Sequence, residues 1–295
     1  MRRFMVLMSF VTCVLLSLTS VLFAQSLQGP IPDQIRTTEE ALKAGYLMVS
    51  GLGVGGNRPH PGQKEVMALR AAQILAYREL LESVQGITIS SETTIENAMA
   101  DEKVRAAVEG VVRGAQTVSK SYDPQKDVAT VYVRLPIKGS GSVMEMVLPH
   151  LQTIIPPPSE TLYTPPADAT PAPTPVPTPP VVPSADGLIV DVTAHVFRPA
   201  LINRILTEQG EILYDPSKIA QEILVERGSG DYTTDTGKAK AILSERGSSN
   251  PITIQAKGVA RRTDVQVSKE DATAIFTANQ ETSFLEGAKV VFVLK

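Results

Sequence analysis

Residues 63–90 read QKEVMALRAAQILAYRELLESVQGITIS and carry the strongest secondary-structure signal in the chain. Apolar residues recur there at spacings of three and four, which is the period of a helix with one buried face. The residues of this predicted face are Met67, Ala71, Ile74, Tyr77, Leu81 and Val84. Gly86 stands where a left-handed glycine commonly ends a helix, and Ile87–Ser90 alternates as a strand. The sequence therefore predicts an amphipathic helix over 63–85 that packs on a sheet.

Upstream of this helix, Tyr46–Gly53 reads as a strand that leads into the glycine-rich turn GLGVGG at 51–56. The turn formally fits the dinucleotide-binding pattern G-x-G-x-x-G, but phosphate binding needs a helix N-terminus directly after the glycines. The segment NRPHPG at 57–62 intervenes and contains two prolines. The pattern therefore favours a glycine-rich strand end or bulge over a nucleotide site.

Downstream, residues 101–112 read as a shorter helix, and two β-rich runs flank the segment DPQKD at 123–127. Such a polar segment between two β-rich runs is typical of a hairpin loop. An apolar helix at 140–153 closes the group. These elements predict a first α/β domain at 45–154, preceded by an N-terminal extension at 25–44.

Strand and helix patterns resume after residue 186 and predict a second α/β domain at 187–295. The expected strands are 188–196, 211–214, 252–260, 264–267 and 289–294, and the expected helices are 216–227 and 269–285. The last run, KVVFVL, is almost continuously apolar, which predicts a strand in the centre of a sheet. ILVERGS at 223–229 is nearly repeated as ILSERGS at 242–248. Two helices that end in Arg followed by Gly explain this similarity, and a duplication is the alternative.

A proline-rich segment separates the two predicted domains, and residues 156–186 hold twelve of the 22 prolines. Proline fixes φ and lacks an N–H donor, so we expect an extended polyproline II linker over 155–186. At about 3.1 Å per residue it would reach roughly 90 Å, enough to hold two domains apart, and a simple tolerant connector is the alternative. The expected fold class is α+β, with two small domains, each a mainly antiparallel or mixed sheet packed by helices.

The N-terminus has the parts of a secretory signal peptide. Arg2 and Arg3 precede an apolar run that ends at Phe23, and Ala24 follows, so we expect a signal at 1–24. An uncleaved membrane anchor is the alternative, because the run approaches bilayer length. Cys13, the only cysteine, lies inside the run and is a poor lipidation site. The mature chain would then have no disulfide and no thiolate chemistry.

The composition is that of a globular protein, with 43% apolar and 20% charged residues. The net charge of −3, with both signs interspersed, argues against a nucleic-acid partner. The chain has no Trp, which argues against a sugar-binding platform. Peripheral membrane association stays open, although the predicted helix at 63–85 has a polar face of mixed charge rather than a basic one.

No pattern predicts a catalytic, cofactor-binding or metal-binding residue. The histidines, which share no ligand spacing, are His60, His150 and His195. The segment GSGDYTTD at 228–235 holds two carboxylates, and a solvated connector is favoured there over a weak calcium site. Two carboxylate pairs receive no acid–base role, because unpaired surface carboxylates are common. These pairs are Glu208 with Glu211 and Asp264 with Glu270.

Residues 45–154 resemble the LPP-twenty lipoprotein family and the N-terminal domain of the flagellar protein FlgT. The resemblance lies in the order of the glycine-rich strand end, the helix "MALRAAQILAYRELLESVQGITI", the short helix before "VVRGA" and the strand "VATVYVRLPI". The C-terminal region of some members of that family is similar to three segments of this chain, "GLIVDVTAHVFRPAL", "ITIQAKGV" and "GAKVVFVL". The resemblance implies an envelope protein of the flagellar or outer-membrane assembly kind and carries over no catalytic residues. Cys13 departs from the lipidated members.

Export and this resemblance together predict a non-enzymatic scaffold or assembly factor of the periplasm or outer-membrane periphery. Its partners would be envelope or flagellar proteins. A periplasmic module that binds a small ligand or cell-wall glycan is the alternative. The oligomeric state stays open.

Overall fold

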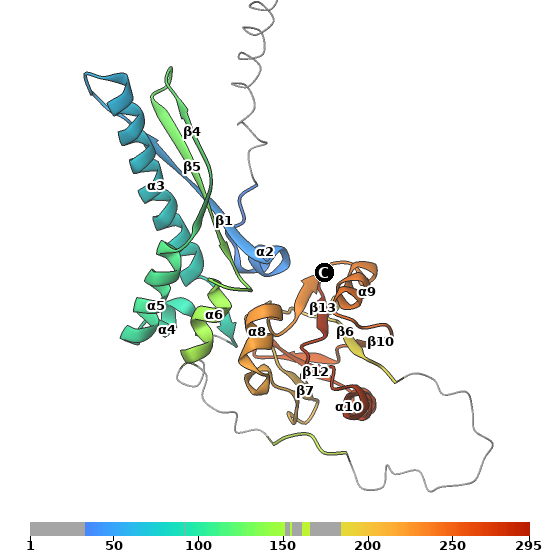
Figure 1. The fold of residues 1–295 in the computed structure, drawn as a ribbon. Coiled ribbons are helices and arrows are strands. Elements are labelled where there is room, and N and C mark those ends of the chain that lie inside the picture. Colours follow the sequence, from blue (N-terminus) through green and yellow to red (C-terminus); the bar gives the residue numbers. More distant parts are fainter. Residues whose placement is uncertain (1–32, 92, 151–153, 155–160, 166–183) are drawn as a thin grey trace, which may run out of the picture. The chain divides into compact units, whose positions relative to one another are not determined.

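The computed structural model describes residues 33–91, 93–150, 154, 161–165 and 184–295 (Figure 1). Residues 34–295 belong to one compact unit. The predicted signal peptide with Cys13 and most of the proline-rich linker lie outside the described residues. We call residues 34–150 the first half and residues 184–295 the second half.

The first half is built on an antiparallel sheet with the strand order β1-β5-β4, and helix α3 covers one of its faces (Figure 1). The elements are β1 (Tyr46–Val54), β4 (Gln116–Asp123), β5 (Val128–Pro136) and α3 (Pro61–Gln85). Asp123 pairs with Val128, so the predicted hairpin is confirmed. Helix α3 begins at Pro61, two residues before the predicted start, because proline is well suited to a first helical position.

Helix α3 lies unusually close to β1, because both contact surfaces are made of small residues. A Cβ atom on Gly51 would lie 2.1 Å from the carbonyl oxygen of Ala72, and one on Gly53 would lie 2.2 Å from that of Ala68. Both distances are far below van der Waals contact, so a side chain has no room at either glycine. The buried stripe of α3 consists of Ala68, Ala72, Ala76, Leu80 and Val84.

The predicted buried face of α3 is therefore wrong in the N-terminal part of the helix, whereas Tyr77 and Leu81 further along are partly buried against the core. Ile74 is 62% exposed and Met67 is 38% exposed, whereas Ala72 and Ala76 are fully buried. Only Val84 belongs to both sets. Gly86 is also not left-handed, since its φ is −71° and its N–H bonds to the carbonyl of Glu82 in the manner of a continuing helix.

The remaining elements of the first half are short. They are α2 (Thr38–Ala44), β2 (Thr88–Ser90), β3 (Thr93–Thr94), α4 (Ile95–Ala98), α5 (Glu102–Arg113), α6 (Val143–Val147) and the 3-10 turn η2 (Leu148–His150). Helix α2 falls within the predicted N-terminal extension, but Thr37 forms a capping box with Glu40, and Ala41 and Leu42 are buried. The predicted helix at 140–153 is reduced to α6 and η2, and residues 151–153 lie outside the described ranges.

The second half contains a parallel sheet and a mixed sheet, with strand orders β10-β6-β13-β9 and β11-β12-β7-β8. The strands are β6 (Gly187–Asp191), β7 (Ile205–Thr207), β8 (Ile212–Tyr214), β9 (Asp231–Thr233), β10 (Pro251–Gln255), β11 (Gly258–Ala260), β12 (Asp264–Val267) and β13 (Val290–Val293). The helical elements are η4 (Pro216–Lys218), α8 (Gln221–Arg227), α9 (Thr236–Glu245) and α10 (Lys269–Thr282). The predicted central position of the last strand is confirmed, and so is the α+β fold class. The predicted strand 252–260 is divided between the two sheets as β10 and β11.

The two copies of the near-repeat occupy equivalent positions. Helix α8 ends at Arg227, which Gly228 follows, whereas α9 ends at Glu245 and is followed by its C-cap Arg246 and by Gly247; the two glycines have φ values of +71° and +74°. The strands that follow, β9 and β10, form the two edges of the parallel sheet. The predicted pair of helices with Arg at the end and Gly after it is thereby confirmed, and both glycines have a positive φ.

Part of the predicted linker packs on the second half. The N–H of Tyr163 donates to the carbonyl of Ile212 at 2.9 Å, and the N–H of Ile212 donates to that of Thr161 at 2.9 Å. The buried Tyr163 ring packs edge-on against Phe276, and its hydroxyl lies 2.7 Å from that of Thr273. Residues 161–163 therefore add to the edge of β8, and the extended strut predicted for 155–186 does not include them.

The two halves are in direct contact. The N–H groups of Leu201 and Ile202 donate to the carbonyls of Thr88 and Ile89 in β2, at 3.0 and 2.8 Å. A single buried apolar cluster contains Ile89 from the first half and Ile202 from the second. Of the two interpretations of the linker, these contacts favour a tolerant connector over a strut that separates the domains.

Candidate functional site

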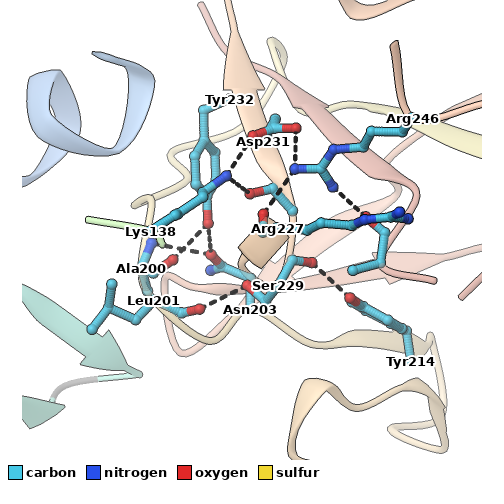
Figure 2. Close-up of polar contacts among 12 residues, drawn as sticks. Lys138, Ala200, Leu201, Asn203, Tyr214, Arg227, Ser229, Asp231, Tyr232 and Arg246 are labelled. Atoms are coloured by element: carbon cyan, nitrogen blue, oxygen red, sulfur yellow. Dashed lines mark hydrogen bonds and ion pairs between the residues drawn. The ribbon is translucent and has the colours of Figure 1, made fainter. Parts of the chain in front are cut away.

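A buried polar cluster lies where the two halves meet, and we call it the junction cluster (Figure 2). It comprises Lys138, Asn203, Tyr214, Arg227, Ser229, Asp231, Tyr232 and Arg246. Lys138, which follows β5, is the residue that the first half contributes to the junction cluster. The N–H of the next residue, Gly139, donates to the carbonyl of Val225 at 2.7 Å, which directs Lys138 into the second half.

Asp231 lies at the centre of the cluster and pairs with a cation from each half. The Lys138 Nζ atom lies 2.5 Å from Oδ1 of Asp231, and an Arg246 nitrogen lies 2.5 Å from Oδ2. The side chains of Lys138 and Asp231 are only 16% and 19% exposed, so both charges are largely removed from water. Lys138 also donates to the carbonyl of Gly230 at 3.1 Å. One carboxylate therefore joins the two halves.

The two repeated arginines hold the chain segments around Asp231. Arg246 donates to the carbonyls of Ala288 and Arg227, at 2.5 and 2.8 Å. Arg227 donates to the carbonyl of Gly287 at 3.2 Å. Each guanidinium thus fastens the end of its helix to the loop that precedes β13.

Burial lowers the pKa of Lys138, and the attraction of Asp231 opposes this change while the charge of Arg246 adds to it. Burial likewise lowers the pKa of Arg246, again against the attraction of Asp231. Lys138 and Arg246 both pair with Asp231, the one anion of the cluster, so Asp231 is needed to keep both charged groups buried. Gly228 makes room for Lys138, because a Cβ there would lie 2.8 Å from Cε of the lysine.

The neutral members of the cluster bind backbone carbonyls. The hydroxyl of Tyr232 donates to the carbonyl of Ala200 at 2.6 Å and also contacts Asn203. The hydroxyl of Tyr214 donates to the carbonyl of Ser229 at 2.6 Å. Burial raises the pKa of both tyrosines, so they stay neutral donors. These partners suit a structural lock better than acid–base chemistry, in which a group must exchange its proton with a substrate.

The glycine-rich turn binds a carboxylate of the protein itself. Asp127 accepts the N–H groups of Gly55 and Gly56 at 3.2 and 2.9 Å, and the hydroxyl of Tyr122 at 2.8 Å. The bond to Asp127 raises the pKa of Tyr122 to about 12, and the bond from Tyr122 lowers that of Asp127. Strand β1 runs as far as Val54, so the interpretation as a glycine-rich strand end is confirmed.

The prediction of an exposed connector at 228–235 is wrong. Gly228, Ser229 and Gly230 are buried, and Asp231 begins strand β9. Asp235 is used as the N-cap of α9, where it accepts the N–H of Lys238 at 2.7 Å. Small polar residues are typical of loops, but here their small size lets Lys138 from the other half pack across them.

The three histidines lie in separate elements. His60 occupies the N-cap position of α3, His150 ends η2, and the Nε2 atom of His195 lies 3.0 Å from the carbonyl oxygen of Ala256. In the part of the chain that the structure describes, no group of three or more His, Cys, Asp or Glu residues is placed to hold a metal ion. Nor do the described helices include one that is long and apolar enough to cross a membrane.

The carboxylate pairs weighed from sequence also have separate surroundings. Glu211 bonds with Thr207, and Glu208 is exposed nearby. Asp264 is buried, which raises its pKa, whereas Glu270 is exposed in the first turn of α10.

The comparisons with known proteins concern the second half. Residues 187–295 match the family model of the second domain of Treponema pallidum Tp0624. No curated protein matches the chain. The C-terminal part of the chain is therefore similar to that domain, and the resemblance of residues 45–154 to the LPP-twenty and FlgT families stays a prediction.

Proposed function

We propose that this protein is a non-enzymatic component of the bacterial envelope, exported to the periplasm or outer-membrane periphery, where it acts as a scaffold or assembly factor. The flagellum is one assembly to which the resemblance of residues 45–154 points. Export is inferred from the charged and apolar segments of residues 1–24.

The observation that carries the proposal is a set of large apolar side chains exposed on the first half. These are Leu52 and Val54 on β1, Val66, Met67, Ile74 and Leu75 on α3, and Val118 on β4. Leu52 and Val54 alternate with Gly51 and Gly53, which face α3, so they lie on the opposite face of the sheet from the α3 residues. Exposed apolar side chains that share a face commonly mark a protein–protein contact. Met67 and Ile74 are seven residues apart on one helix and therefore share a face.

The buried charges of the junction have roles within the fold, which also supports a structural function. Lys138 and Arg246 both pair with Asp231, and the two cations give their remaining bonds to backbone carbonyls. The protein therefore offers a firmly joined two-part body with an apolar surface.

The test is a double substitution, Met67→Glu with Ile74→Glu, expressed in place of the normal protein. Association with envelope complexes, measured by cross-linking in intact cells and sedimentation of the extract, should fall at least about tenfold, because charges would enter an apolar contact. Circular dichroism should be unchanged, since neither side chain is buried. Val196→Glu is the matched control, because Val196 is 88% exposed and lies on the second half. A wild-type protein that sediments free and monomeric would contradict the proposal, as would undiminished association of the double variant.

A further inference from the structure

A groove of about 520 Å³ lies between α6 and η2 of the first half and α8 of the second half. Figure 1 shows α6 and α8 side by side. The first half lines it with Gly139, Ser140, Glu145, Leu148 and Pro149, and the second half with Gln221, Glu222, Val225 and Glu226. Its volume is within the range of roughly 300–1,000 Å³ that is usual for ligand pockets.

The charge around this groove has one sign. Glu145, Glu222 and Glu226 are all exposed, and among the residues that the structure describes no Lys, Arg or His lines the groove. Glu222 and Glu226 are four residues apart on α8 and therefore lie on the same face of the helix. The N–H of Gly141 donates to Glu145 at 2.6 Å, which holds that carboxylate in place. The occupant that this potential attracts is cationic.

The apolar part of the lining indicates what kind of cation fits. Leu148, Pro149 and Val225 line the groove beside the glutamates. A metal ion is disfavoured, because among the described residues no three acidic or histidine side chains converge on one point. A polypeptide segment can supply separated positive charges together with an apolar side chain, which matches both features.

We propose that this groove binds a cationic, partly apolar segment of a partner protein. The groove has walls from both halves, and the bond from Gly139 to the carbonyl of Val225 joins them. The partner segment therefore binds only while the halves are docked. The inference rests on the proposed function as an assembly factor and names the chemistry of one partner contact.

The experiment uses the full chain without residues 1–24 and a fluorescent acetyl-Lys-Leu-Lys-Leu-Lys peptide, with binding followed by fluorescence anisotropy. The double variant Glu222→Lys with Glu226→Lys should bind the peptide at least about tenfold more weakly. Added salt should weaken binding to the wild type, because the carboxylates are exposed to solvent. Glu245→Lys with Glu281→Lys changes the net charge equally at exposed sites that do not line the groove, and it should bind normally.

Two further peptides separate charge from apolar contact. A Glu-Leu-Glu-Leu-Glu peptide should not bind, and Lys-Ser-Lys-Ser-Lys should bind more weakly than the leucine peptide. The inference is overturned if the groove variant binds like the wild type or if the acidic peptide binds as tightly as the basic one. The variant Met67→Glu with Ile74→Glu should bind the peptide normally, so failure of the groove and failure of the apolar surface on α3 give different results.

Discussion

The Nζ atom of Lys138 lies 2.5 Å from Oδ1 of Asp231, although the two residues are 93 positions apart in the chain. Lys138 belongs to the first half, and Asp231 begins the strand β9 of the second. Arg246 occupies the other oxygen of the same carboxylate. Loss of this one carboxylate would leave two cations at the junction without their counter-ion.

Asp231→Asn should therefore lower the free energy of unfolding by about 3 kcal/mol, because removal of one partner from a buried ion pair leaves an uncompensated charge. Urea unfolding followed by circular dichroism measures this loss. Lys138→Met is the matched comparison and should have a smaller effect, since Asp231 keeps Arg246 and the methionine fills most of the lysine's volume. Equal losses in the two variants would show that Asp231 does not serve both cations.

Gly51→Ala should destabilise the first half by about 1–3 kcal/mol or more, because the added methyl group would overlap the backbone of α3 at Ala72. Gly110→Ala is the control. Gly110 lies within α5 and a Cβ there meets no atom within 4 Å, so this change should raise stability by about 0.5–1 kcal/mol. Thermal and urea unfolding of the two variants test the contrast. A neutral Gly51→Ala variant would mean that α3 does not pack on β1 as described.

Asp186 should make the protein sensitive to acid. Burial alone raises the pKa of Asp186, but hydrogen bonds from Ser248, Ser249 and Asn250 outweigh it and hold the pKa well below the ordinary value of 3.8. As pH falls, the unfolded state binds this proton first, so the stability due to Asp186 is present above about pH 4 and is lost below it.

The urea concentration at the unfolding midpoint of the wild type should therefore decrease as the pH is lowered from about 7 to about 3, and that of Asp186→Asn should decrease less. Asparagine keeps the size of the side chain but has no proton to gain in this range. Identical pH dependence in the two proteins would rule out the role assigned to this carboxylate.

Helix α3 shows which features of the fold follow from the local sequence and which depend on tertiary contacts. The spacing of apolar residues predicted a helix over 63–85, and the helix is there. The same spacing selected Met67 and Ile74 as buried, because they are large and apolar. The close approach of α3 to the glycines of β1 instead leaves room only for alanines on the facing side of the helix. The contact of Gly51 with Ala72 depends on how the helix returns across the strand.

The sequence by itself determined the secondary-structure elements that have strong local signals. These include the β4–β5 hairpin, the helix at 63–85, the central β13 and the glycine that ends α8, since propensity, periodicity and left-handed φ depend on a few neighbouring residues. Only the tertiary structure decided the buried face of α3, the strand identity of Asp231 and its pairing with Lys138. These features depend on which distant segments meet, and the free energy of burying a lysine beside an aspartate exists only once the two halves have docked.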